Sequence, residues 1–364
     1  MNKQVQLFDL SVSNKSLLEI NKGIKKIISK KDFILGEDVK KFEKRFSNFL
    51  NSQYTLGLNS GTDSLEIALR SLDIGPGDEV IVPSFSFFAS SEVILKTGAQ
   101  PIYCDINLED LTLNLVHLKN IISEKTKAVI AVHLFGNSVD LQRLKNIVSG
   151  QSIYIIEDVA QAFGSTFKDK YLGSIGEFGC FSFYPTKNLG AFGDAGAITF
   201  NKKKYLKKTS SLRNHGNVGN YFHDYVGFNS RLDSMQALIV DTKLKTIKTE
   251  LKQRIKNNNK YIENIDTEIY NIHSQKNQPM NVMPITIKNH KMLSKLKILL
   301  DRERISYGSY YPFGLHEFPI SELKQPNRSF PNTDFIKKNI ITLPCHPGVT
   351  ISNVNKITNL INKV

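Results

Sequence analysis

Short runs of strand-forming residues alternate with helical stretches between Tyr54 and Phe200, and this alternation constrains the fold more than any other feature of the sequence. It is typical of a mostly parallel sheet covered by helices. The expected strands are Tyr54–Leu58, Glu79–Val82, Pro101–Asp105, Ala128–His133, Tyr154–Glu157, Gly179–Phe183 and Gly196–Phe200. The expected helices between them include Ser64–Leu72, Ser86–Thr97 and Val139–Val148. We therefore predict an α/β fold built on a seven-stranded, mostly parallel sheet.

The remaining sequence predicts a smaller α/β domain at the C-terminus. One long helical pattern runs from about Asp233 to Ile262, a strand is expected at Val282–Ile287, and helices are expected at Met292–Arg304 and Val354–Val364. A chain of 364 residues exceeds what a single hydrophobic core usually holds. We expect a large domain over residues 1–248, which includes an N-terminal segment, and a small domain over residues 249–364.

The formal net charge of +14 makes a non-catalytic protein that binds through a basic surface one alternative. The lysines are interleaved with apolar residues at helical spacing, however, in stretches such as Lys202–Lys208 and Lys243–Lys256, as on solvated helix faces. We expect no nucleic-acid partner, but a positive field that attracts anionic small molecules.

The sequence has no long apolar run and no signal-peptide pattern, so we expect a cytoplasmic protein without a membrane partner. Its three cysteines, Cys104, Cys180 and Cys345, are far apart and form no C-x-x-C pair, so neither a disulfide nor a metal site is expected.

Lys187 follows the predicted strand Gly179–Phe183 in a loop too rich in glycine and proline to be helical. A lysine forms Schiff bases with aldehydes when its amine is neutral, and a partly desolvated position lowers its pKa toward that state. The alternative is an ordinary surface lysine, and only the neighbouring motifs can decide between the two.

Two further segments place polar groups at the ends of predicted strands. Asp158 lies at the end of the strand that begins at Tyr154, where a parallel sheet presents its ligand crevice, although a turn or capping role is the alternative. Asn59 to Ser64 lies between a strand and a helix, so its N–H groups and hydroxyls form either an anion site or a simple N-cap.

Taken in order, these motifs resemble the DegT/StrS-type sugar aminotransferases, a family of fold-type I enzymes that use pyridoxal 5'-phosphate (PLP). The resemblance covers nearly the whole chain. The matching segments are Phe33-Ile-Leu-Gly, Asn59-Ser-Gly-Thr-Asp-Ser-Leu, Val132-His-Leu-Phe-Gly, Glu157-Asp-Val-Ala-Gln, Phe181-Ser-Phe-Tyr-Pro-Thr-Lys-Asn-Leu, Arg213-Asn-His-Gly and Gly227-Phe-Asn-Ser-Arg.

The resemblance implies PLP as cofactor and a role for each matching residue. Lys187 would carry PLP as a Schiff base, Asp158 would keep the pyridine nitrogen protonated, and Gln161 would lie near the phenolic oxygen. Gly61, Thr62, the backbone of Asp63 and Ser182 would hold the phosphate, and Phe87 would lie against the ring unless it is a core residue. Asn229 would reach the phosphate from the other subunit of a homodimer with shared active sites. Substrate contacts would come from His215, Tyr311 and His316.

The implied reaction moves an amino group from L-glutamate, which becomes 2-oxoglutarate, to a nucleotide-diphospho keto-sugar in amino-sugar and surface-polysaccharide biosynthesis. The form of residues 61–65, 184–186 and 229–231 is more similar to family members that aminate C-3 than to those that aminate C-4. A PLP-dependent sugar dehydratase, a lyase on the same scaffold, is the nearest alternative, but a histidine replaces the lysine in those relatives.

Overall fold

The computed structural model describes residues 4–323, 325 and 328–364. Its main sheet has seven strands, as predicted, and they lie in the order β1-β9-β8-β5-β4-β2-β3. The strands are β1 (Tyr54–Leu58), β2 (Glu79–Pro83), β3 (Gln100–Cys104), β4 (Thr126–Val132), β5 (Tyr154–Asp158), β8 (Phe178–Ser182) and β9 (Gly196–Phe200). Only β9 runs antiparallel to its neighbours, so the sheet is mostly parallel.

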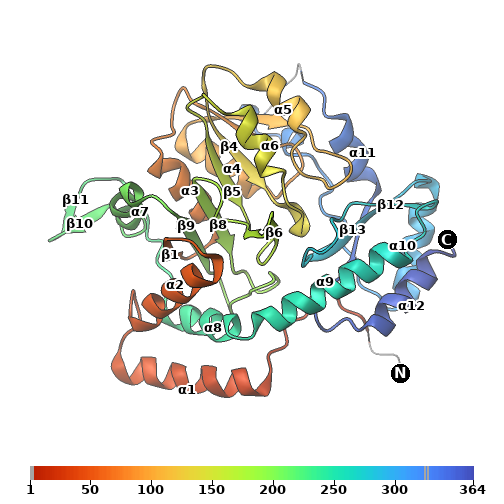
Figure 1. The fold of residues 1–364 in the computed structure, drawn as a ribbon, viewed down its shortest axis with the longest axis horizontal. Coiled ribbons are helices and arrows are strands. Elements are labelled where there is room, and N and C mark those ends of the chain that lie inside the picture. The colour runs from red at the N-terminus through yellow and green to blue at the C-terminus, as the bar shows by residue number, and fades with distance from the viewer. Residues whose placement is uncertain (1–3, 324, 326–327) are drawn as a thin grey trace.

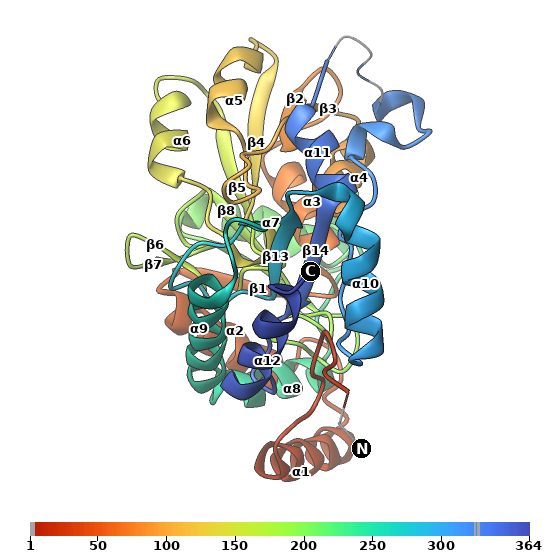
Figure 2. The same cartoon turned by 90° about the vertical axis from the view of Figure 1, so that its right-hand side faces the viewer.

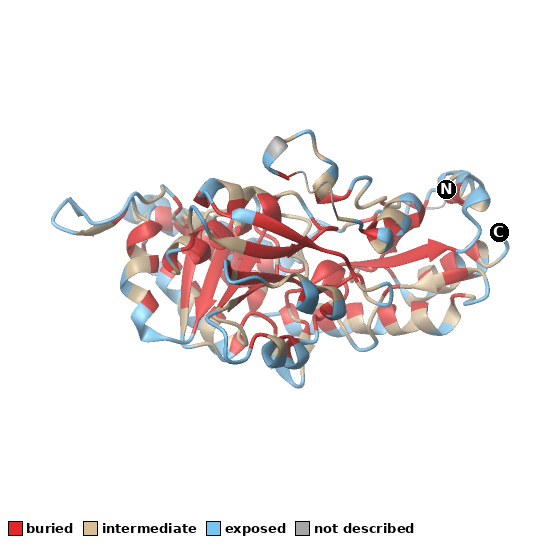
Figure 3. Cartoon of the chain, turned by 90° about the horizontal axis from the view of Figure 1, so that it is seen from above, coloured by how far each residue is buried: buried red, intermediate tan, exposed pale blue. Residues whose placement is uncertain are grey.

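Helices cover both faces of this sheet and bury a separate core on each face (Figure 1). One face packs against α3 (Gly61–Ser71), α4 (Ala89–Thr97) and α7 (Leu206–Leu212). The other face packs against α2 (Glu37–Leu50), α5 (Leu115–Ile121), α6 (Leu141–Ile147) and α8 (Ser234–Leu244). The central strands are therefore buried on both sides, which explains their continuous apolar runs (Figure 3).

The prediction of one long helix from Asp233 to Ile262 is wrong, because the chain forms two helices, α8 and α9 (Ile247–Asn264). At the break, the N–H groups of Lys245 and Thr246 donate to carbonyls three residues earlier instead of four. The two helices then follow different partners: α8 packs on α1 (Asn14–Lys30) and α2, whereas α9 packs on α12 (Ile351–Ile361). The helical spacing of apolar residues continues through the break, so the sequence pattern does not reveal it.

A second sheet of three antiparallel strands follows: β12 (Tyr270–Ile272), β13 (Val282–Ile287) and β14 (Ile340–Pro344). The predicted strand Val282–Ile287 is confirmed. Around this sheet lie α9, α10 (Leu293–Arg302), α11 (Pro331–Asn339) and α12 (Figure 2). One hydrophobic cluster runs from the main sheet into this second sheet, and the domain boundary near residue 248 stays a prediction.

The remaining elements are short. Two hairpins are formed by β6 (Thr166–Phe167) with β7 (Lys170–Tyr171) and by β10 (Asn217–Gly219) with β11 (Phe222–His223). The 3-10 helices are Leu134–Gly136, Lys203–Tyr205, His290–Met292, Leu315–Glu317 and Ser321–Leu323. In the part of the chain that the structure describes, no helix is long and apolar enough to cross a membrane.

Candidate active site

A cavity of about 670 Å³ opens where the carboxyl ends of β4, β5 and β8 meet the first turn of α3. The C-terminal part of the chain also lines the cavity, through Asn281 and Val282 at the start of β13 and through Tyr310 and Tyr311 in the loop after α10. Strands of a parallel sheet end on the same edge, so residues far apart in the sequence meet here. Eight of the predicted site residues line this cavity: Gly61, Thr62, Phe87, Asp158, Gln161, Ser182, Lys187 and Tyr311.

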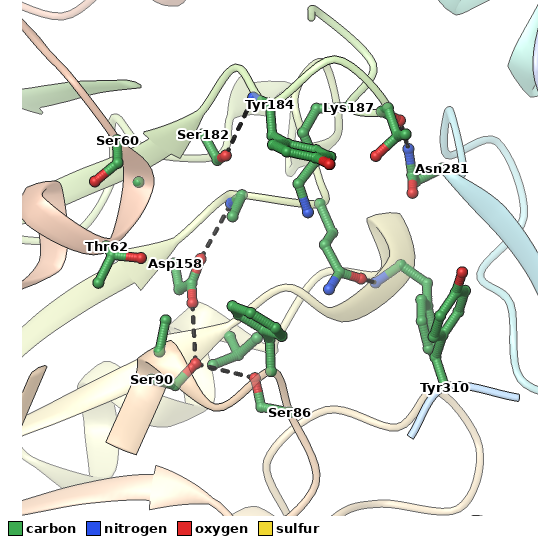
Figure 4. A pocket seen from close by; sticks show the side chains of 18 of the residues that line it. Ser60, Thr62, Ser86, Ser90, Asp158, Ser182, Tyr184, Lys187, Asn281 and Tyr310 are labelled. Carbon is green, nitrogen blue, oxygen red and sulfur yellow. Dashed lines mark hydrogen bonds between the residues drawn. The ribbon is translucent and has the colours of Figure 1, made fainter. Parts of the chain in front are cut away.

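The amine of Lys187 projects into the cavity from the loop after β8 (Figure 4). A turn fixes the backbone there, since the N–H of Lys187 donates to the carbonyl of Tyr184 at 2.8 Å. Desolvation lowers the pKa of the Lys187 amine, and the nearby carboxylate of Asp158 opposes that shift only in part. A larger fraction of this amine is therefore neutral than for a surface lysine, as nucleophilic attack on an aldehyde requires.

Asp158 ends β5 and places a buried carboxylate at the floor of the cavity. Oδ1 accepts a hydrogen bond from the N–H of Ala160 at 3.1 Å, and Oδ2 accepts one from the hydroxyl of Ser90 at 3.2 Å. Burial raises the pKa of Asp158, while these bonds and the charge of Lys187 lower it in part. The carboxylate is therefore poised to accept a bond from a protonated, cationic group in the cavity.

Ser86 and Ser90 form a short hydroxyl chain behind this carboxylate, with 3.0 Å between their oxygens (Figure 4). Both side chains are buried and line the cavity. Sequence reasoning missed them. Helical spacing could not have found the pair, because Ser86 lies in the bend before α4 and only Ser90 lies in the helix.

The first turn of α3 faces the cavity beside the end of β8. The hydroxyl of Ser60 caps this helix by accepting from the N–H of Asp63 at 3.0 Å. A Cβ at Gly61 would lie 2.7 Å from the Cβ of Ser182, so only glycine lets the helix approach the strand this closely. The resulting cradle combines a helix N-terminus with the hydroxyls of Thr62 and Ser182, which suits an anion.

Gln161 and Tyr311 form the opposite wall. The Oε1 of Gln161 accepts from the N–H of Phe135 at 3.1 Å, and its Nε2 donates to the Tyr311 hydroxyl at 2.8 Å. Burial raises the pKa of Tyr311, so its hydroxyl keeps a proton to donate. Phe87 is 57% exposed and lies 6.3 Å from the Tyr311 ring, so it is a cavity residue and not a core residue.

Four predicted site residues do not line the cavity. Asp63 uses its N–H in the helix cap described above. His215 lies just before the β10–β11 hairpin, and its carbonyl accepts from the ring of His223. Asn229 pairs with Arg231, and His316 lies against Phe330 with 4.5 Å between ring centres. The roles assigned to these four residues stay predictions.

His316, Glu317 and Asp334 bring ligand atoms within 4.8 Å of one another, a spacing that a metal ion could use. The ammonium of Lys337 donates to both carboxylates, at 2.7 Å to Asp334. A protein cation therefore already occupies the position that a metal ion would take.

The donor set of the cavity fits PLP. Its anion cradle suits a phosphate, the buried Asp158 suits a protonated pyridine nitrogen, and the Lys187 amine suits an aldehyde. Fold and cavity together define a PLP-dependent enzyme of fold type I.

The comparisons with known proteins make this class specific. The model of the DegT/DnrJ/EryC1/StrS aminotransferase family matches residues 16–362. The chain is 32% identical over 348 residues to a UDP-N-acetyl-3-dehydro-alpha-D-glucosamine 3-aminotransferase of Acidithiobacillus ferrooxidans, covering 95% of this chain and 93% of that protein. It is also 32% identical over 346 residues to a dTDP-3-amino-3,6-dideoxy-alpha-D-galactopyranose transaminase of Aneurinibacillus thermoaerophilus, covering 95% of each.

Among solved structures, NtdA of Bacillus subtilis with bound cofactor PMP superimposes with a TM-score of 0.92 at 26% identity. That alignment covers 100% of this chain and 86% of that one. The chain therefore belongs to the DegT/DnrJ/EryC1/StrS aminotransferase family. The predicted fold, the aminotransferase class and PLP as cofactor are confirmed at the level of this family.

Proposed function

We propose that this protein is a sugar aminotransferase that moves an amino group from L-glutamate to C-3 of a nucleotide-linked keto-sugar, in amino-sugar and polysaccharide biosynthesis. The observation that carries the proposal is the enclosure of the Lys187 amine and the Asp158 carboxylate in one cavity beside an anion cradle. The two relatives described above support C-3, since both names place the amino group at position 3.

Bound PLP supplies an electron sink for the substrate carbon that carries the amino group. The residues of this chain do the rest. Nζ of Lys187 would move a proton between that carbon and C4' of the cofactor, as general base toward one atom and general acid toward the other, which its lowered pKa favours. Asp158 keeps the pyridine nitrogen protonated, and the hydroxyl of Ser90 holds the carboxylate in place. Thr62, Ser182 and the N-terminus of α3 bind the phosphate.

The choice of donor and of sugar position gives a direct test. We expect the purified enzyme to convert a 3-keto nucleotide sugar to the 3-amino product with L-glutamate, with kcat/KM at least about tenfold above that for a 4-keto sugar, a difference of about 1.4 kcal/mol. Product position is read by NMR and 2-oxoglutarate release by a coupled assay. Amination at C-4 alone would contradict the regiochemistry, whereas no turnover with any keto-sugar would contradict the proposed function.

We also propose a homodimer with two shared active sites, in which Asn229 of one chain completes the phosphate site of the other. Asn229 does not line the cavity of its own chain, which supports a role outside that chain. It follows a hairpin that projects from the body of the molecule (Figure 1). In this region Tyr221 and Val226 are 94% and 92% exposed, and exposed apolar residues of this kind mark interaction surfaces.

Mixing two inactive variants tests the shared site. If Asn229 serves the partner, a heterodimer of Lys187→Ala and Asn229→Ala chains has one doubly altered site and one intact site. Random exchange should then restore roughly a quarter of wild-type activity, because half of the dimers are mixed and half of their sites are intact. Activity is compared with the unmixed variants after subunit exchange is verified by mass spectrometry. An activity equal to the mean of the two parents would assign Asn229 to its own chain.

A further inference from the structure

We infer that Asn281 is a specificity-determining residue, whose side-chain oxygen accepts a hydrogen bond from a hydroxyl or amide N–H group on the sugar. The inference rests on the proposed function, because it names a feature of the sugar that the same cavity would recognise. Asn281 lies just before β13, is 6% exposed, and lines the cavity.

Two hydrogen bonds fix which way the amide of Asn281 points. Its Nδ2 donates to the carbonyl of Thr186 at 3.2 Å and to Oδ1 of Asn188 at 3.1 Å. A carbonyl can only accept, so the atom that faces Thr186 must be the nitrogen. Asn188 is fixed in the same way, since its Nδ2 donates to the carbonyls of Phe163 and Pro279 at 3.1 and 2.8 Å.

Both N–H groups of the Asn281 amide therefore donate to the residues that flank Lys187, and its Oδ1 remains available as an acceptor. Figure 4 shows this oxygen on the side of the amide opposite the bond to Thr186. In the described part of the chain no donor meets it. Its only remaining role toward a ligand is to accept a hydrogen bond.

The backbone keeps this acceptor from moving away. The N–H of Asn281 donates to the carbonyl of Phe135 at 2.8 Å. Its carbonyl and that of Met280 accept from the buried guanidinium of Arg254, at 3.3 and 3.2 Å. Segment 280–281 is thus tied both to the loop after β4 and to helix α9.

A fixed acceptor at a cavity wall discriminates between substrates. Water satisfies Oδ1 while the cavity is open, but a bound sugar displaces that water. A sugar with a donor at the facing position replaces the lost bond, whereas a deoxy sugar leaves the oxygen unpaired, and unpaired buried polar groups weaken binding and reaction. Asn281 should therefore favour a keto-sugar that carries a hydroxyl or an acetamido group over its deoxy counterpart.

The test compares Asn281→Ala with wild type on UDP- and dTDP-linked keto-sugars that differ pairwise by one hydroxyl or acetamido group. One pair should differ at the group that binds Oδ1 of Asn281. For that pair, the substitution should lower kcat/KM of the donor-bearing sugar about 10- to 100-fold, whereas kcat/KM of the deoxy sugar should change less than about threefold. Calorimetry with the corresponding amino-sugar products gives a second readout, in which affinity for the donor-bearing product should fall in the same proportion.

Single-turnover rates with glutamate separate recognition from a merely structural effect on Lys187. The inference predicts that this half-reaction stays within about threefold of wild type. A parallel slowing of both half-reactions, or unchanged discrimination across all pairs, would overturn it. If Asn281→Ala does not fold, Asn281→Ser permits the same comparison.

Asn258→Ala is the matched control. Asn258 is also a buried asparagine, and it donates to the carbonyls of Gln275 and Gln278 in the loop between β12 and β13. It does not line the cavity. Its loss should leave the discrimination unchanged. Wild-type enzyme that turned over no keto-sugar would instead reject the proposed function, so the two failures are distinguishable.

Discussion

Replacing Lys187 with alanine is expected to lower the rate of transamination by at least about 10³-fold, or about 4 kcal/mol in barrier height. Alanine removes the only amine that the described chain directs into the cavity, so no side chain can move the proton at the substrate carbon. PLP should still bind, because the α3 cradle and Asp158 do not depend on Lys187.

Three measurements check this expectation. Borohydride treatment followed by mass spectrometry should link PLP to the wild-type peptide that contains Lys187 and to no peptide of the variant. Dialysis should remove PLP from the variant, and absorbance should show that it binds again. Lys170→Ala is the control, since Lys170 lies exposed in the β6–β7 hairpin outside the cavity. A Lys187→Ala rate within about tenfold of wild type would refute the assignment.

The order of strands and helices in the main sheet could be predicted from the sequence because burial on both faces imposes apolar runs of strand length. The break between α8 and α9 could not. Residues on either side of Lys245 continue the same apolar spacing, and the two helices separate because α8 packs on α1 and α2 while α9 packs on α12. Such a choice of partners depends on tertiary contacts that local periodicity does not contain.

Some residues of the candidate site could likewise be predicted from the sequence, and others could not. The ends of predicted strands, where a parallel sheet presents its crevice, made Lys187 and Asp158 candidates, and the family motifs around them decided against an ordinary surface lysine and a capping aspartate. Asn281 gave no such signal, since it lies 94 residues beyond Lys187 and reaches the loop only through packing of the second sheet. Asn229 and His215 matched family motifs, yet neither lines the cavity of its own chain.

Asp158→Asn is expected to slow both half-reactions by about 10²- to 10³-fold, because an amide does not hold a pyridine nitrogen in its protonated form. The amide can keep the local bonds. Its oxygen accepts from the N–H of Ala160, and its nitrogen can donate to Ser90, whose hydroxyl then turns toward Ser86. PLP should therefore remain bound while the single-turnover rates fall with glutamate and with the keto-sugar alike.

The same substitution should stabilise the protein when PLP has been removed. The pKa of Asp158 is raised in the folded state even with the attraction of Lys187 included, so the folded protein binds this proton more tightly than the unfolded chain. Stability is therefore lost as the pH rises from the ordinary aspartate pKa of about 3.9 through the raised value, so at neutral pH Asp158 destabilises the folded protein. Asparagine carries no such charge.

Denaturant unfolding of the PLP-free proteins, measured from neutral pH down toward the ordinary aspartate pKa of about 3.9, should show Asp158→Asn more stable than wild type at neutral pH. Its advantage should shrink as the pH is lowered. Asp169→Asn, which alters an exposed carboxylate in the turn after β6, should change neither stability nor rate appreciably. Lower stability of Asp158→Asn at neutral pH together with unchanged half-reaction rates would make Asp158 a structural residue. Gain of stability with loss of rate would instead show that the folded chain holds a destabilising charge where the reaction uses it.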